Sequence, residues 1–258
     1  MLLEGRNAVI YGGGGAMGGA VAEAFAREGA TVHLAGRTRA KLETVAERIR
    51  SAGGTAETAV LDALDEAAVD EHADALAASA GRLDISFNLI STGDVQGTLL
   101  AEMALDEFER PVTNRVRTQF LTARAAARHM IPQGSGVILT VGGNGGRDPI
   151  RDYCTGGYQV ALGGTQVAFG AIDVLRRQLA VELGPHGIRV LTLESGGVPE
   201  TIAEEWRDVI GAGLVSTSML KRPETLEDLG NIAVFAASDM ARNMTGTSLN
   251  MTLGRVAD

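Results

Sequence analysis

The sequence predicts an α/β fold in which a parallel sheet of about seven strands is covered by helices on both faces. Short apolar runs alternate with longer amphipathic stretches along the whole chain. Strands and helices in this repetition form a parallel sheet, because each helix returns the chain to the same edge. A glycine-rich segment follows the first run directly and indicates a tight turn into a helix. We therefore expect residues 1–258 to form one doubly wound domain.

Each predicted strand is a short apolar run between turn residues. The seven runs are residues 7–11, 31–35, 59–61, 83–90, 136–141, 188–193 and 248–251. Stretches such as 20–29 and 39–54 repeat apolar residues every three or four positions and end in glycine, which is typical of amphipathic helices. We also expect long helices at about 105–130 and 160–183, because helical periodicity continues through both.

Two segments break this alternation. Residues 142–164 contain eight glycines and Pro149, too many for a regular element, and residues 199–222 carry Trp206 in a mixed polar pattern. Long irregular segments in compact domains are usually functional. We therefore predict that both lie on the substrate side.

Composition and charge argue against several classes of protein. The net charge of −9 at pH 7 repels a phosphate backbone and disfavours nucleic-acid binding. No window of 18 or more apolar residues predicts a membrane span, and the N-terminal stretch lacks the pattern of a leader, so we expect a soluble, cytoplasmic protein. The single cysteine, Cys154, cannot form an intrachain disulfide. The four histidines are too scattered to suggest a metal site: His33, His72, His129 and His186.

The segment GGGGAMGG, residues 12–19, joins the first predicted strand to a helix. Glycines at such a turn allow backbone N–H groups to approach a pyrophosphate, which then lies at the positive end of the helix. The alternative is a flexible turn, but the position between strand and helix favours dinucleotide binding. The predicted phosphate-binding residues are Gly12, Gly14, Gly15, Ala16, Met17 and Gly18.

The end of the second predicted strand, residues AGRT, favours NADP over NAD. An acidic side chain here would bind a ribose hydroxyl, whereas Gly36 leaves space and Arg37 offers donors that match a phosphate. Thr38 is assigned to the same subsite. The alternative is that Arg37 is a solvated surface residue.

These features together resemble the short-chain dehydrogenase/reductase family, whose fold is a Rossmann fold, over nearly the whole chain. Tyr11 and residues 12–18 stand where that family has Thr-Gly-x-x-x-Gly-x-Gly, with alanine replacing the middle glycine. Segments 179–190 and 244–254 match the family's closing helix, strand and C-terminal pattern. The resemblance assigns further cofactor-binding positions: Asp62 and Ala63 at the adenine, Asn88, Leu89 and Ile90 after the fourth strand, and Ser195, Gly196 and Val198 at the nicotinamide.

The catalytic residues implied by the resemblance are mostly absent. Asn114 matches the family's helix asparagine, which holds a water in the proton relay. The family's serine, however, falls on Gly143, its tyrosine on Thr165 and its lysine on Phe169. The chain has only two lysines, Lys41 and Lys221, and both belong to other elements. We expect the Phe169 ring to pack on the ribose or nicotinamide, with weaker nucleotide affinity than is usual in the family.

Without the lysine, the remaining chemistry is biased toward reduction. A free phenol has a pKa of about 10, so near pH 7 it can donate a proton but is a poor base. Tyr153 is the first candidate donor, since it falls about where enoyl reductases of the superfamily carry their tyrosine, and Tyr158 is the second. Arg147 and Arg151 could stabilise developing negative charge. The alternative for each tyrosine is a ring packed in the loop.

Three functions remain open at the level of sequence. The first is an NADPH-dependent reductase of a carbonyl or activated C=C in a small organic or acyl substrate. The second is an NADP(H)-binding relative without redox activity, such as a sensor or partner subunit, and the third is a non-redox enzyme on the same fold. We also expect a homodimer or homotetramer, because the two long helices resemble those that pair in family oligomers.

Overall fold

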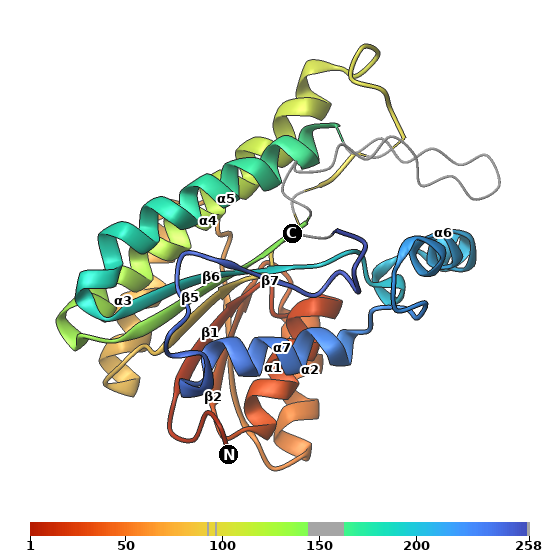
Figure 1. The fold of residues 1–258 in the computed structure, drawn as a ribbon. Helices are drawn as coiled ribbons and strands as arrows, with labels where there is room; N and C mark the ends of the chain where they lie inside the picture. The colour runs from red at the N-terminus through yellow and green to blue at the C-terminus, as the bar shows by residue number, and fades with distance from the viewer. Residues whose placement is uncertain (92, 96, 144–162, 257–258) are drawn as a thin grey trace.

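The computed structural model describes residues 1–91, 93–95, 97–143 and 163–256 (Figure 1). It confirms the predicted α/β fold, with seven strands in one parallel sheet. The strands are β1 Asn7–Tyr11, β2 Thr31–Gly36, β3 Thr55–Val60, β4 Ile85–Asn88, β5 Gly136–Gly142, β6 Ile188–Glu194 and β7 Ser248–Asn250. Six of the seven runs match their predicted positions closely.

The strand order is β3-β2-β1-β4-β5-β6-β7, so the chain changes direction between β1 and β4. These two strands pair directly, with Ala8 opposite Ile85 and Tyr11 opposite Asn88. In doubly wound sheets a ligand binds in the crevice outside the carboxyl ends of the strands at such a switch point. The topology therefore places the expected nucleotide site above the ends of β1 and β4.

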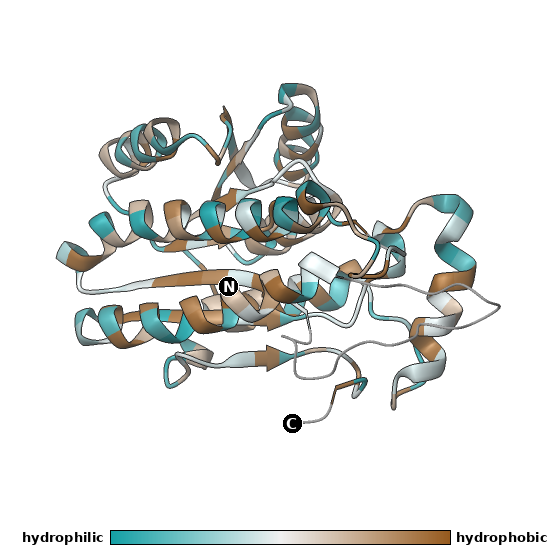
Figure 2. Cartoon of the chain, turned by 90° about the horizontal axis from the view of Figure 1, so that it is seen from above, coloured by the Kyte–Doolittle hydropathy of each residue, from teal (hydrophilic) through white to brown (hydrophobic). Residues whose placement is uncertain are grey.

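Helices cover both faces of the sheet (Figure 1). Helices α1 Ala16–Arg27, α2 Arg39–Ser51 and α7 Leu226–Ala237 contribute to the buried cluster on one face, and α3 Glu66–Ala80, α4 Leu105–Gln133 and α5 Gly163–Leu183 to that on the other. Long stretches of the visible strands are brown in Figure 2, whereas the helices alternate brown with teal, as expected for strands buried on two faces and helices buried on one. No helix in the described ranges has the length and apolar character needed to cross a membrane.

The structure differs from the sequence prediction in two places. The third strand begins at Thr55 instead of residue 59, because β3 lies at the edge of the sheet and alternates polar with apolar residues. Segment 199–222 holds the helix α6 Glu204–Thr217, which stands apart from the two main layers in Figure 1. Its Trp206 and Val209 side chains are both 43% exposed, and its buried residues are Gly211, Gly213 and Leu214. A helix that buries so little shows no clear hydrophobic period.

The histidine His72 makes the stability of the folded protein depend on pH. Its ring, in α3, meets the Tyr11 ring edge-on at 6.0 Å between centroids. Burial, and secondarily the charge of His33, lower the pKa of His72 from 6.5 to about 4. The unfolded chain therefore binds a proton between these two pH values that the folded chain does not bind. Stability is fully present above pH 6.5 and decreases as the pH falls toward 4.

We expect the free energy of unfolding to fall by about 3 kcal/mol through this group as the pH decreases from 7 to 4. Urea unfolding at several pH values measures the decrease. In His72→Phe, which keeps an aromatic ring but cannot titrate, the slope with pH should be smaller than in the wild type. Equal slopes in the two proteins would contradict the assignment.

Candidate active site

The glycine-rich loop lies at the carboxyl end of β1, against the ends of its neighbours β2 and β4. The backbone N–H of Gly12 donates to the carbonyl of Ala35 at 2.8 Å, and that of Gly15 donates to the carbonyl of Gly12 at 3.0 Å. Gly12 has a φ of +83°, and a Cβ there would lie 2.6 Å from the carbonyl oxygen of Leu89. A Cβ on Gly18 would overlap the Gly12 carbonyl oxygen. Only glycine fits at these two positions.

The glycine loop leads directly into α1, so the N-terminus of this helix faces the expected nucleotide site. Gly15 is the N-cap of α1, and Ala16 and Met17 form its first turn, which carries no acidic side chain. The N-terminus of a helix presents unpaired N–H groups and a partial positive charge. The residues present therefore fit a bound pyrophosphate.

Strands β2 and β3 bring the adenosine-side residues to the same edge. Arg37 and Thr38 directly follow β2 and are exposed, and Thr38 is the N-cap of α2. Asp62 follows β3 and is also exposed, with Oδ1 accepting a hydrogen bond from the Leu64 N–H at 3.0 Å. Ala63 is buried in the core. Arg37, Thr38 and Asp62 are thus accessible to a ligand, whereas Ala63 has a packing role.

After β4, Asn88 holds the turn that the resemblance assigns to the cofactor. Its Oδ1 accepts from the N–H of Ile90 at 3.1 Å, and its Nδ2 donates to Oγ1 of Thr122 at 3.3 Å. The Leu89 N–H donates to the carbonyl of Tyr11 at 2.8 Å. Asn88 is 8% exposed, so its amide fixes the backbone at the switch point.

The segment after β6 is held by two residues that sequence reasoning missed. The Ser195 N–H donates to the Gly142 carbonyl at 3.1 Å. The Gly196 N–H donates to Oε2 of Glu224 at 2.9 Å, and Arg255 donates to the Gly196 carbonyl. Val198 is buried, and its carbonyl accepts from the Thr201 N–H at 3.0 Å. Burial raises the pKa of Glu224, against the hydrogen bonds from Ser195 and Gly196 that lower it.

The expected reaction centre contains a close packing of Phe169 on Gly143. A Cβ added to Gly143, directly after β5, would lie 2.5 to 3.1 Å from three atoms of the Phe169 ring, which comes from α5. The Arg115 guanidinium, from α4, lies with its Cζ 4.7 Å from the centroid of that ring. Thr165, one turn before Phe169, is 2% exposed. Sequence reasoning identified Gly143, Thr165 and Phe169 but not Arg115.

The predicted proton donors cannot be placed in this geometry. Tyr153 and Tyr158 lie outside the described residues, as do Arg147, Arg151 and Cys154. Asn114 precedes Arg115 on α4 and is partly buried. Among the residues that the structure describes, no three His, Cys, Asp or Glu side chains gather as metal ligands would.

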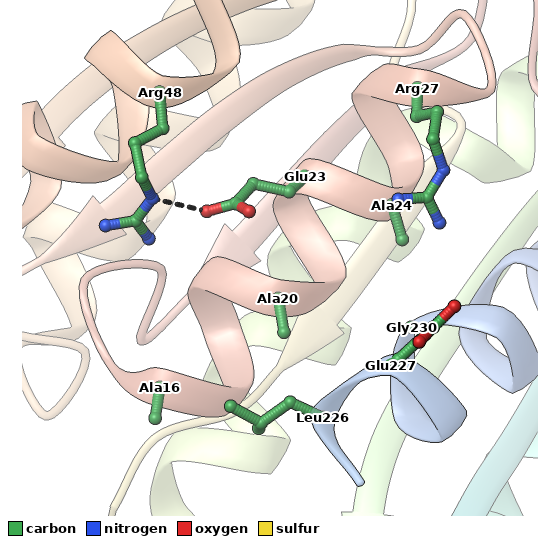
Figure 3. A pocket seen from close by; sticks show the side chains of 9 residues that line it. All are labelled: Ala16, Ala20, Glu23, Ala24, Arg27, Arg48, Leu226, Glu227 and Gly230. Atoms are coloured by element: carbon green, nitrogen blue, oxygen red, sulfur yellow. Dashed lines mark hydrogen bonds and ion pairs between the residues drawn. The ribbon is translucent and has the colours of Figure 1, made fainter. Parts of the chain in front are cut away.

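An open groove of about 470 Å³ lies between α1 and α7, with Arg48 of α2 at its border (Figure 3). At this border, Arg48 Nε donates to Oε1 of Glu23 on α1 at 2.7 Å. Of the predicted phosphate-binding residues, the groove includes Ala16 alone. It follows the outer side of these helices, so we do not assign it to the reaction.

Comparison with known proteins identifies the family. A family model described as enoyl-(acyl carrier protein) reductase matches residues 14–255. A solved short-chain type dehydrogenase/reductase from Mycobacterium marinum is 30% identical, covers 99% of this chain and 97% of its own, and superposes with a TM-score of 0.84. The chain belongs to the short-chain dehydrogenase/reductase family.

Curated relatives within this family are dehydrogenases and other oxidoreductases. Secoisolariciresinol dehydrogenase of Forsythia intermedia is 32% identical over 96% of this chain and 87% of its own length. The 7alpha-hydroxysteroid dehydrogenase of Clostridium sardiniense is 30% identical over 95% and 90%. The short-chain dehydrogenase/reductase fold and the glycine loop together support an oxidoreductase that uses a nicotinamide nucleotide.

Proposed function

We propose that the protein is an NADPH-dependent reductase of a carbonyl or activated C=C in a small organic or acyl substrate. The observation that carries this proposal is the glycine loop that leads into α1, where a Cβ on Gly12 or Gly18 would meet backbone atoms. Phe169 offers no ammonium at the expected lysine position, which biases the chemistry toward reduction. The bound cofactor supplies a hydride. A tyrosine phenol of the chain then gives its proton to the substrate, which the un-ionised form can do near pH 7.

Residues at the carboxyl edge of the sheet are assigned to hold the nucleotide. The pyrophosphate lies at Gly12, residues 14–18 and the start of α1, and the adenosine lies beside Asp62. The nicotinamide is assigned to residues 195–198, where Glu224 and Arg255 hydrogen-bond to the backbone of Gly196. These residues are proposed to bind and orient the cofactor. The turn at Gly196 can do so because hydrogen bonds hold both its N–H and its carbonyl.

The preference for NADPH is assigned to Arg37. Arg37 is exposed and directly follows β2. The carbonyl of Ala35, near the end of β2, accepts hydrogen bonds from the glycine loop. We therefore expect the Arg37 guanidinium to lie beside the ribose of the cofactor. In Arg37→Asp we expect a tenfold to roughly hundredfold weaker affinity for NADPH, since charge-assisted hydrogen bonds to a phosphate are lost. The affinity for NADH should stay the same or improve. Fluorescence titration with both nucleotides measures the change.

Arg27→Asp is the matched control for Arg37→Asp. Arg27 is equally exposed and lies in the last turn of α1, at the opposite end from the phosphate site. The variant Arg27→Asp should leave the affinities for NADPH and NADH unchanged. If Arg37→Asp weakens NADPH and NADH equally, the residue contributes no preference for the phosphate.

Tyr153 is proposed as the proton donor, with Tyr158 as the second candidate. We expect wild-type protein to oxidise NADPH with members of a carbonyl and enone panel, and Tyr153→Phe to lose about 100-fold or more in kcat, the effect of a missing general acid. A loss in Tyr158→Phe instead would transfer the role to that residue. Unchanged turnover in both variants would exclude a tyrosine donor at these positions.

The main alternative is an NADP(H)-binding protein without redox activity. It is favoured by the packing of Phe169 on Gly143, because the ring fills the space that a serine side chain on residue 143 would need. Tight NADPH binding with no turnover on any member of the panel would support this alternative. Turnover without nucleotide consumption would support a non-redox enzyme.

We also propose that the protein is a homodimer or homotetramer that pairs through its long helices. On α5, Val167, Val174 and Val181 are spaced seven residues apart and are 46%, 63% and 73% exposed. Residues spaced by seven lie along one side of a helix. Light scattering should give at least twice the chain mass for the wild type and a smaller assembly for Val174→Glu.

A further inference from the structure

The backbone of Gly196 is held between two side chains of opposite charge. Its N–H donates to Oε2 of Glu224 at 2.9 Å, and its carbonyl accepts from Nη1 of Arg255. Hydrogen bonds to charged partners are roughly twice as strong as those between neutral groups. Within the same turn, the Gly197 N–H donates to Oγ of Ser195 at 3.1 Å. The charged pair therefore fixes the direction of the turn directly after β6.

The Glu224 side chain is directed at this turn. It is 3% exposed and lies two residues before the start of α7. A carboxylate so deeply buried destabilises a fold unless hydrogen bonds and opposite charges compensate. The groups that favour its charged form are the hydrogen bonds from Ser195 and Gly196 and the guanidinium of Arg255. The interactions that keep Glu224 charged thus all come from the turn and its second charged partner.

Arg255 is presented to the turn by a strained stretch of backbone after β7. Leu253 has a φ of +58°, a left-handed conformation that is unfavourable for leucine. Its carbonyl accepts from the Met219 N–H at 2.9 Å, and Nδ2 of Asn250 donates to the carbonyl of Val256 at 2.8 Å. Strain of this kind persists only where surrounding contacts impose it, and it is concentrated at functional sites. The stretch is therefore held in the shape that brings Arg255 to Gly196.

We propose that Glu224 and Arg255 are positioning residues for the nicotinamide half of the cofactor. This inference rests on the proposed function, which assigns the nicotinamide to residues 195–198, and it names the two side chains on which that subsite depends. The pyrophosphate and adenosine are assigned to other parts of the sheet edge, after β1, β2 and β3. Loss of either side chain should therefore weaken the binding of the nicotinamide ring and leave the rest of the nucleotide bound.

The test compares two probes that differ only in the nicotinamide ring. NADPH carries the ring, and 2′-phospho-ADP-ribose is the same molecule without it. Each is titrated by calorimetry into the full-length protein. We expect the wild type to bind NADPH roughly tenfold or more tightly than the fragment, the usual effect of hydrogen bonds made in a well-oriented site. Equal affinities for the two probes would overturn the proposal.

Variants of both residues connect this preference to the charged pair. Glu224→Ala and Arg255→Met should each weaken NADPH binding roughly tenfold or more, since a hydrogen bond to a charged group is lost. The affinity for 2′-phospho-ADP-ribose should stay the same. Glu224→Gln should regain most of the NADPH affinity, because its amide oxygen still accepts from the Gly196 N–H, and Arg255→Lys should regain part. A merely structural role would weaken both probes equally, and that result would exclude positioning.

Glu227→Ala is the matched control. Glu227 is exposed on α7, three residues after Glu224, and its replacement should leave the affinities for both probes unchanged. Should Glu224→Ala unfold, as thermal unfolding would reveal, the decision passes to Arg255→Met. A wild-type preference for NADPH in Arg255→Met would then overturn the proposal.

The two titrations also separate this inference from the proposed reductase activity. A protein whose preference for NADPH depends on Glu224, but which never oxidises NADPH with the substrate panel, would keep the positioning pair and lose the proposed reaction. A protein that reduces a ketone with NADPH, and in which Glu224→Ala weakens both probes equally, would do the reverse.

Discussion

Replacement of Gly18 by alanine is expected to weaken NADPH binding roughly 100-fold, about 2.7 kcal/mol. The added Cβ would overlap the carbonyl oxygen of Gly12 and approach the carbonyl carbon of Gly12 to 2.8 Å. Both are backbone atoms, so neither can turn aside as a flexible side chain would. The loop must shift away from α1, so we expect its N–H groups no longer to converge on the proposed phosphate site. Fluorescence titration with NADPH measures the loss.

Gly184→Ala is the control for the general effect of adding a methyl group. A Cβ on Gly184, in the 3₁₀ turn Gly184–His186, would meet no atom within 4 Å. This variant should bind NADPH as the wild type does. Near-normal affinity in Gly18→Ala would show that the loop does not form the phosphate site.

The second large effect is expected from placing a serine at residue 143, the position that the resemblance assigns to the family's serine. Gly143→Ser should destabilise the protein by about 1 to 3 kcal/mol, the usual result of overpacking. Its Cβ would lie 2.5 Å from the nearest atom of the Phe169 ring, which is held from another side by Arg115. In the background Phe169→Ala the same serine should cost much less, because the ring is gone. Urea unfolding of the four proteins gives the coupling energy.

A second serine tests whether this coupling is specific. Gly184→Ser in the wild-type and Phe169→Ala backgrounds should give additive changes, since no atom lies near that position. Additivity of Gly143→Ser with Phe169→Ala would contradict the contact. The expected coupling gives a physical reason why residue 143 carries no side chain in a protein that has phenylalanine at residue 169.

Most of the fold was predictable from the sequence because buried parallel strands and one-sided helices have different apolar periods. That signal fails where burial is low, as in α6 with its exposed Trp206, and where an edge strand alternates, as in β3. In both places the polar residues obscure the period.

The candidate site was predictable only in part. The glycine loop and Arg37 follow strands at fixed offsets, and a parallel sheet brings such positions to one edge. Arg115 and Glu224 have no such signal, because an arginine next to Asn114, or a glutamate after a proline, looks like a surface residue until packing is known. The contact of Phe169 with Gly143 joins residues 26 positions apart, and no period in the sequence specifies it.

The hydrogen bond from Arg255 to Gly196 has a practical consequence for handling the protein. Arg255 follows β7 by five residues, so the segment after β7 helps to fix the turn at Gly196, which we propose holds the nicotinamide. A purification tag fused after residue 258 would be attached three residues after Arg255. A tag before Met1 would be attached near the amino end of β1, the end opposite the glycine loop. Material for binding measurements is therefore best tagged at the amino terminus.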